Sequence, residues 1–108
     1  MGLDTEFLRE RTYRAQLCLV QLSSRSLAAC VDPLSLSDLA PLARVLVAPG
    51  VVKVMHASRQ DLEVLLPFAG LTGPVFDTQI AASLAGLPAQ VGYAELVRRL
   101  LEIGRAHV

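Results

Sequence analysis

The chain has 108 residues, a length typical of one small domain, and 53% of them are hydrophobic, which excludes a largely disordered protein. Ten basic residues balance ten acidic ones, so binding of nucleic acid through overall positive charge is excluded. Charged residues interrupt every apolar run before it reaches bilayer length, and acidic residues near the N-terminus replace the positive charge of a signal peptide. We therefore expect a cytoplasmic protein with no membrane segment.

Hydrophobic residues recur along the chain in patterns that predict strands and helices in a definite order. The expected elements are a strand carrying Asp4 and Glu6, strands at residues 16–22 and 27–31, a helix at 37–47, a strand at 51–55, a helix at about 58–69, a short strand at 75–76, a small helix at 77–86 and a helix at 93–101. The early strands follow one another as hairpins, whereas the later strands alternate with helices. This order predicts an α/β fold with a mixed sheet and flanking helices.

Three local features of these elements are specific enough to compare with a structure. Ser37 is expected to cap the first helix. The β-branched run at residues 51–55 is typical of a strand that is covered on both faces. Cys18 and Cys30 lie in apolar runs without metal-ligand spacing, so we expect both thiols to be buried and reduced.

Two acidic residues share one face of the first strand. Side chains at alternate positions of a strand point to the same side, so Asp4 and Glu6 converge while Thr5 and Phe7 face the other way. Adjacent carboxylates repel each other unless a cation neutralises them, and oxygen ligands suit Mg²⁺ or Mn²⁺. Taken alone, the motif is explained more simply as a solvated strand end.

A second polar group lies where the strand at residues 51–55 runs into a helix, a position at which α/β sheets carry their sites. His56 lies at this junction, and Asp61 lies near the first turn of the helix. Glu63 points to a different helical face, so Asp61 is the better candidate for a third carboxylate. The helix dipole alone also favours an acid at this position.

Other polar residues have structural interpretations. Asp77 and Thr78 are interpreted as a helix cap. Arg9, Arg11 and Arg14 could bind phosphates, but a solvated loop explains them equally well.

Taken together and in order, these motifs resemble ribonuclease D, a family of DEDD-type 3′→5′ exonucleases with a ribonuclease H-like fold. The resemblance runs from residue 3 to about Leu101. The segments that carry it are residues 4–7, 9–13, 16–21, 32–34, 56–57, 61–63 and 76–82. It implies hydrolysis of phosphodiester bonds at RNA 3′ ends, such as those of tRNA precursors, with two divalent metal ions (Mg²⁺ or Mn²⁺).

The resemblance also implies a role for each candidate residue. Asp4 would bridge the two ions, Glu6 would ligate the ion that activates water, and Asp61 would hold the second ion. The backbone from Thr5 to Phe7 and the ring of Phe7 would lie near the terminal nucleotide, and His56 would support the substrate side of the site.

The chain departs from the family in its second half. The family's third motif, Tyr-x-x-x-Asp, is absent, because Tyr93 is followed four residues later by Val97. The family's helical nucleic-acid-binding domains are absent as well. We therefore expect residues 1–101 to be a partial exonuclease domain with negligible hydrolytic activity. A non-catalytic RNA- or protein-binding module of nuclease fold is the alternative.

The last residues have a separate interpretation. The codons GAG ATC GGA AGA GCA CAC GTC, which can encode residues 102–108, match the start of a common sequencing adapter and precede a TGA stop. We therefore expect residues 102–108 to be a non-native tail.

Overall fold

The computed structural model describes residues 1–9 and 15–105. Its elements are the strands β1 (Gly2–Arg9), β2 (Ala15–Ser23), β3 (Ala28–Val31), β4 (Lys53–Met55) and β5 (Val75–Asp77) and the helices α1 (Ala40–Val47), α2 (Arg59–Ala69), α3 (Thr78–Leu84) and α4 (Tyr93–Arg105). The strands and helices follow one another in the order expected from the sequence.

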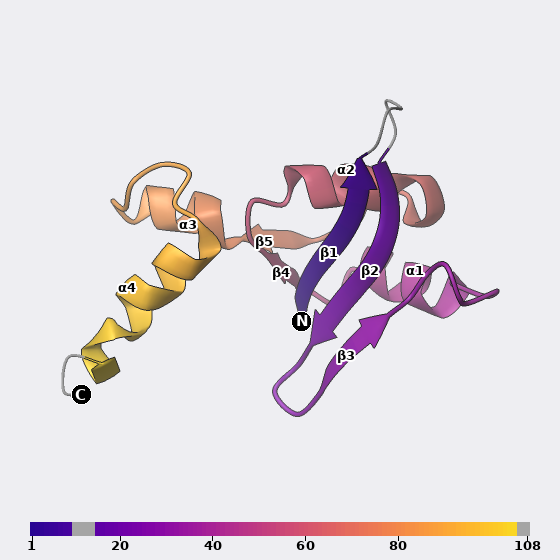
Figure 1. Cartoon of the computed structure of the whole chain (residues 1–108), viewed down its shortest axis with the longest axis horizontal. Helices are drawn as coiled ribbons and strands as arrows, with labels where there is room; N and C mark the ends of the chain where they lie inside the picture. Colours follow the sequence, from indigo (N-terminus) through magenta and orange to yellow (C-terminus); the bar gives the residue numbers. More distant parts are fainter. Residues whose placement is uncertain (10–14, 106–108) are drawn as a thin grey trace.

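The five strands form one mixed sheet in the order β3-β2-β1-β4-β5. The pairs β1–β2 and β2–β3 are antiparallel, whereas β1–β4 and β4–β5 are parallel. Strand β1 lies at the centre, and helices α1 and α2 lie behind the sheet (Figure 1). The predicted α/β architecture is therefore confirmed. The contact between β1 and β4 is short, because Gly2 and Val54 are its only register partners.

The main core lies between the sheet and helices α1 and α2. Its buried members are Leu3, Val20, Leu42, Leu46, Met55 and Leu65. A charged side chain, Lys53, is fully buried beside them on β4. Its Nζ donates hydrogen bonds to the carbonyl oxygens of Ala48 (2.8 Å) and Gly73 (2.9 Å). Lys53 thus connects the segments that precede β4 and β5.

A second, smaller core joins α3 to the loop that precedes α4 and to α4 itself. It consists of Ala82, Val91 and Leu96, with Leu87 packed against them. These helices extend to one side of the sheet (Figure 1), and the chain measures 48 × 35 × 26 Å. Its accessible surface is 7771 Å², whereas a compact protein of this mass exposes about 5,800 Å².

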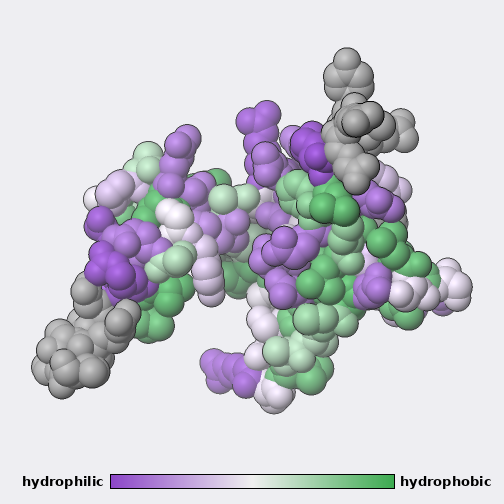
Figure 2. Space-filling model, viewed as in Figure 1, coloured by the Kyte–Doolittle hydropathy of each residue, from purple (hydrophilic) through white to green (hydrophobic). Residues whose placement is uncertain are grey.

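The excess surface is partly apolar. Figure 2 shows apolar side chains on the sheet face that is turned toward the viewer and along α4. On this face Val54 is 39% exposed and Phe76 is 51% exposed. The expectation that the strand at residues 51–55 is covered on both faces is therefore wrong for this chain. Only the face that carries Lys53 and Met55 is buried, and Val54 on the other face is exposed.

Two further expectations need correction. Helix α1 begins at Ala40, and Ser37 does not cap it. The Ala40 amide instead donates to Asp38 Oδ1 at 3.0 Å. Cys30 is exposed rather than buried, because its register partner Gln21 places it on the open face of the sheet. Cys18 is half-buried, and both cysteines are free thiols as expected.

The last helix is longer than expected. Helix α4 continues past Leu101 to Arg105, so the first part of the expected tail at residues 102–108 is helical. The interpretation of this tail as non-native stays a prediction.

Candidate active site

Asp4 and Glu6 lie on the open face of β1. The alternation along this strand buries Leu3 and Thr5 against the helices and exposes the two acids. A β-bulge follows directly, because Glu6 pairs with Leu19 while Phe7 pairs with Leu17. Bulges twist a strand and change the direction of nearby side chains, and they are common next to active sites. The predicted shared face of the two carboxylates is the face that the structure shows.

Asp61 comes to β1 from the opposite side. It lies in the first turn of α2 and is buried, with 8% of its surface exposed. Its carboxylate accepts a hydrogen bond from the buried hydroxyl of Thr5. Glu63, two residues further on, points to solvent and lies 3.7 Å from Arg59 as an ion pair. The structure therefore places Asp61, and not Glu63, beside the strand that carries the other two acids.

The surroundings of Asp61 favour its protonated form. Burial is the largest cause and raises the pKa of its carboxyl above the usual value. Hydrogen bonds from Thr5 lower the pKa, and the negative charge of Asp4 raises it again. Asp4 and Asp61 are thus close enough to repel each other, and a cation between them would relieve this repulsion.

His56 is held by bonds to other parts of the chain. Its Nε2 donates to the carbonyl oxygen of Val91 at 2.8 Å, and its Nδ1 lies 2.8 Å from Thr78 Oγ1. The ring also meets Tyr93 edge to face, with 5.6 Å between ring centres. Because both ring nitrogens have partners, the structure leaves neither for a metal ion. His56 thus joins β4 to α3 and α4.

Asp77 accepts four hydrogen bonds. It is the N-cap of α3, as predicted, and its Oδ1 accepts from the amide of Gln79 at 2.9 Å. Oδ1 also accepts from the amide of Ala57 at 3.0 Å, and Oδ2 accepts from the amide and hydroxyl of Ser58, both at 2.8 Å. Burial alone would raise the pKa of Asp77, but these donors outweigh it and lower the pKa.

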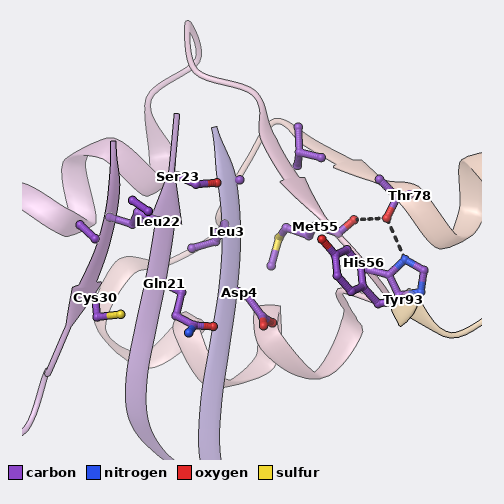
Figure 3. Close-up of a pocket in the computed structure, with 14 residues that line it drawn as sticks. Leu3, Asp4, Gln21, Leu22, Ser23, Cys30, Met55, His56, Thr78 and Tyr93 are labelled. Atoms are coloured by element: carbon purple, nitrogen blue, oxygen red, sulfur yellow. Dashed lines mark hydrogen bonds between the residues drawn. The ribbon is translucent and has the colours of Figure 1, made fainter. Parts of the chain in front are cut away.

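An open groove of about 690 Å³ runs along the uncovered sheet face beside Asp4. Asp4 and its register partner Gln21 line one part of it, and His56 and Tyr93 line another (Figure 3). The groove combines one carboxylate with amide, imidazole and phenol groups. Leu22, Ala29 and Val54 also line it, so polar groups and apolar side chains lie side by side in a groove that is larger than a single ion.

The acids fit divalent cations by their chemistry. Asp4 and Glu6 offer carboxylate oxygens on one exposed face, and the charge of Asp4 acts on Asp61. Among the side chains that the structure describes, however, no three from His, Cys, Asp or Glu converge as a metal-binding group. Asp61 does not join Asp4 and Glu6 in such a group, because its hydrogen bond from Thr5 directs the carboxylate to the buried face of β1.

The remaining predicted residues are placed as follows. Thr5 is buried, so its backbone, not its side chain, remains for contact with a nucleotide. Phe7 is half-buried and Arg9 is exposed near the end of β1. Arg11 and Arg14 lie outside the described residues. Substrate contacts of Thr5, Phe7 and His56 stay predictions.

Sequence reasoning missed several polar features, two of which involve β1 and β4. The first is the bond between Thr5 and Asp61, which joins residues 56 positions apart. The second is the burial of Lys53, whose signal was a lone charged residue in a β-branched run. Among the described residues, no helix has the length and apolar character needed to cross a bilayer.

The chain is similar to known nucleases both in sequence and in structure. Ribonuclease D of Granulibacter bethesdensis is 50% identical over 109 residues, which cover 97% of this chain and 28% of that protein. The crystal structure of Escherichia coli RNase D, described as an exoribonuclease involved in structured RNA processing, superposes with a TM-score of 0.86 at 44% identity, covering 92% of this chain and 27% of that one. NrnC of Brucella melitensis with bound Mg²⁺ superposes with a TM-score of 0.79 at 30% identity, covering 94% of this chain and 52% of that one.

The chain thus spans little more than a quarter of the length of the ribonuclease D relatives that it matches. Over residues 1–106 it matches the family described as 3'-5' exonuclease. The similarity to ribonuclease D therefore covers nearly the whole chain, including the strand that carries Asp4 and Glu6 and the helix that carries Asp61. The chain belongs to the 3'-5' exonuclease family.

Proposed function

We propose that this chain forms the metal-binding part of a ribonuclease D-like 3′→5′ exoribonuclease. The observation that carries the proposal is the placement of Asp4 and Glu6 on the open face of β1, with Asp61 reaching the same strand from α2. The open groove beside Asp4 supports it, because a chain end could lie along the sheet there.

Each acid has a distinct role in this proposal. Asp4 and Glu6 would supply carboxylate oxygens from the open face of β1, with Asp4 shared between two divalent ions, and Asp61 would supply the third carboxylate from α2. When bound, two such ions stabilise the attacking and leaving oxygens of an in-line displacement at phosphorus. For Asp61 to take part, its carboxylate would have to turn from Thr5 toward Asp4.

The proposed substrate is the 3′ end of an RNA, with precursors of the tRNA type as candidates, and the proposed compartment is the cytoplasm. The free thiols of Cys18 and Cys30 suit a reducing compartment. We further propose that these 108 residues alone hydrolyse RNA negligibly, because they contain no Tyr-x-x-x-Asp motif, and Tyr93, followed four residues later by Val97, is no substitute for it. Loss of a metal ligand and of the group that orients water removes stabilisation of the transition state.

Binding of Mn²⁺ to the 108-residue chain tests the proposal directly. A ligand that binds only the folded chain stabilises it, by about 2.7 kcal/mol at a concentration 100-fold above its Kd. We expect Mn²⁺ to raise the melting temperature, EDTA to reverse the increase, and Asp4→Ala to abolish it. Glu63→Gln is the matched control, because this exposed acid lies on α2 close to Asp61 but away from β1.

A melting temperature that Mn²⁺ does not change, or an increase that survives in Asp4→Ala, would contradict the proposed metal site. Release of nucleoside monophosphates from 3′-labelled RNA checks the second part. We expect none above background, and release that Asp4→Ala abolishes would show that the chain is active without the third motif.

A further inference from the structure

The turn between β4 and α2 has a backbone conformation that needs support. Strand β4 ends at Met55 and helix α2 begins at Arg59, so only three residues make the turn. Ala57 has φ +52°, in the left-handed region that residues with a side chain rarely adopt. Ser58 is the N-cap residue of α2, but its side chain makes no capping bond to this helix.

Asp77 supplies the missing support from another part of the chain. Only one of its four hydrogen bonds, from the amide of Gln79, serves as the cap of its own helix α3. The other three come from the amides of Ala57 and Ser58 and from the Ser58 hydroxyl, 19 or 20 positions earlier in the sequence. One carboxylate therefore fixes the starts of α2 and α3 together.

The turn determines where Asp61 lies. Asp61 follows Ser58 by three residues, within the first turn of α2, and the Leu62 amide donates to the Ser58 carbonyl oxygen at 2.9 Å. A change in the φ of Ala57 would rotate this helix start relative to β1, and the carboxylate of Asp61 would move away from Thr5 and Asp4. We propose that Asp77 is a positioning residue for the metal site, holding the 56–58 turn in the conformation that brings Asp61 to β1.

This inference rests on the proposed function, since it assigns Asp77 a part in that same site. Asp77 makes no contact with Asp4, Glu6 or Asp61 among the hydrogen bonds of the described residues. It acts through the backbone of Ala57 and Ser58. A purely structural cap of α3 would leave the turn, and hence the affinity for metal, unchanged.

Asp77→Asn separates these two roles. Asparagine is as good an N-cap as aspartate, and its Oδ1 can still accept from the amides of Gln79 and Ala57. Its amide nitrogen replaces Oδ2 and is a donor, so it cannot accept from the amide or hydroxyl of Ser58. Asp32→Asn is the matched control. Asp32 also accepts from a backbone amide and a hydroxyl in a turn, those of Leu34 and Ser35, on an exposed segment.

The measurement is the Kd for Mn²⁺ of the 108-residue chain, obtained by electron paramagnetic resonance of free Mn²⁺ at a temperature where each variant is folded by circular dichroism. We expect Asp77→Asn to weaken binding about tenfold and Asp32→Asn to leave it unchanged. We also expect Ala57→Gly to restore much of the affinity in the Asp77→Asn background, because glycine adopts positive φ without steric cost. This rescue would not follow if Asp77 only capped α3.

The outcomes separate the two proposals. Absence of Mn²⁺ binding that depends on Asp4 in the unsubstituted chain overturns the proposed function and this inference together. Binding that depends on Asp4 but is equal in Asp77→Asn and Asp32→Asn overturns this inference alone. This inference is also overturned if Asp77→Asn weakens Mn²⁺ binding and Ala57→Gly does not restore it. In each case the amide ¹H–¹⁵N signals of Ala57 and Ser58 show whether the turn has moved.

Discussion

The hydroxyl of Thr5 on β1 donates a hydrogen bond to the carboxylate of Asp61 on α2, and both side chains are buried. This bond joins the central strand of the sheet to the helix that covers it. It also fixes the one acid of the candidate site that does not lie on the open face. Each of its partners has a substitution that keeps the shape of the side chain and changes only its polar atoms.

Thr5→Val removes the hydroxyl and keeps the shape of the side chain. We expect the free energy of unfolding to fall by about 1–3 kcal/mol, because a buried carboxyl group loses a partner. We also expect the pKa of Asp61 to rise further, because the lost hydrogen bond lowers it at present. Urea unfolding measures the first effect and NMR titration the second. Thr5→Ser retains a hydroxyl, so an equal loss in both variants would contradict the assignment.

Asp61→Asn tests the pH dependence. The pKa of Asp61 is raised in the folded chain above the usual value of 3.8, so the folded state binds more protons than the unfolded state. Stability from this residue is therefore present at low pH and is lost as the pH rises from about 3.8 through the folded pKa. We expect Asp61→Asn without metal to be more stable than the native chain above that pKa, by about 1.4 kcal/mol for each pH unit that separates the folded pKa from the unfolded pKa.

Urea midpoints measured between pH 3.5 and 8 check this prediction. The stability difference between Asp61→Asn and the native chain should increase with pH and then level off. The contribution of Asp77 to stability has the opposite pH dependence. Its pKa is lowered in the folded chain, so its contribution is lost as the pH falls below the usual pKa of 3.8. A difference that is constant over the whole range would show that Asp61 has an ordinary pKa.

Lys53→Met should destabilise the chain. The substitution leaves the carbonyl oxygens of Ala48 and Gly73 without their donor, and we expect a loss of about 1–3 kcal/mol in urea unfolding at pH 7. Burial lowers the pKa of Lys53, so the native chain should gain stability over this variant as the pH rises toward 10.5. Val54→Met is the control, because Val54 neighbours Lys53 on β4 but is partly exposed. Equal losses in both variants would assign the effect to the strand and not to the Lys53 ammonium.

The sequence predicted those parts of the site that depend on local periodicity. The alternation of side chains along β1 places Asp4 and Glu6 on one face, independently of contacts with the rest of the chain. The choice of Asp61 over Glu63 follows in the same way from helical geometry, and the structure confirms that Asp61 faces β1. The cap formed by Asp77 on α3 depends only on residues 77–79, and it is confirmed as well.

The features that could not be predicted depend on contacts between distant segments. Nothing near Thr5 indicates that its hydroxyl meets Asp61, and nothing near Asp77 indicates that it holds Ala57 and Ser58. The prediction that the strand at residues 51–55 is covered on both faces was wrong for a related reason. A β-branched strand indicates a capacity for burial, but whether an element covers it depends on the whole fold.

The open sheet face affects how the chain should respond to denaturant. The dependence of unfolding free energy on urea concentration is proportional to the surface that unfolding exposes. This chain already exposes 7771 Å² when folded, so unfolding uncovers roughly a fifth less surface than in a compact protein of equal mass. Its unfolding transition should therefore be broad, and the heat capacity change on unfolding should be small for 108 residues.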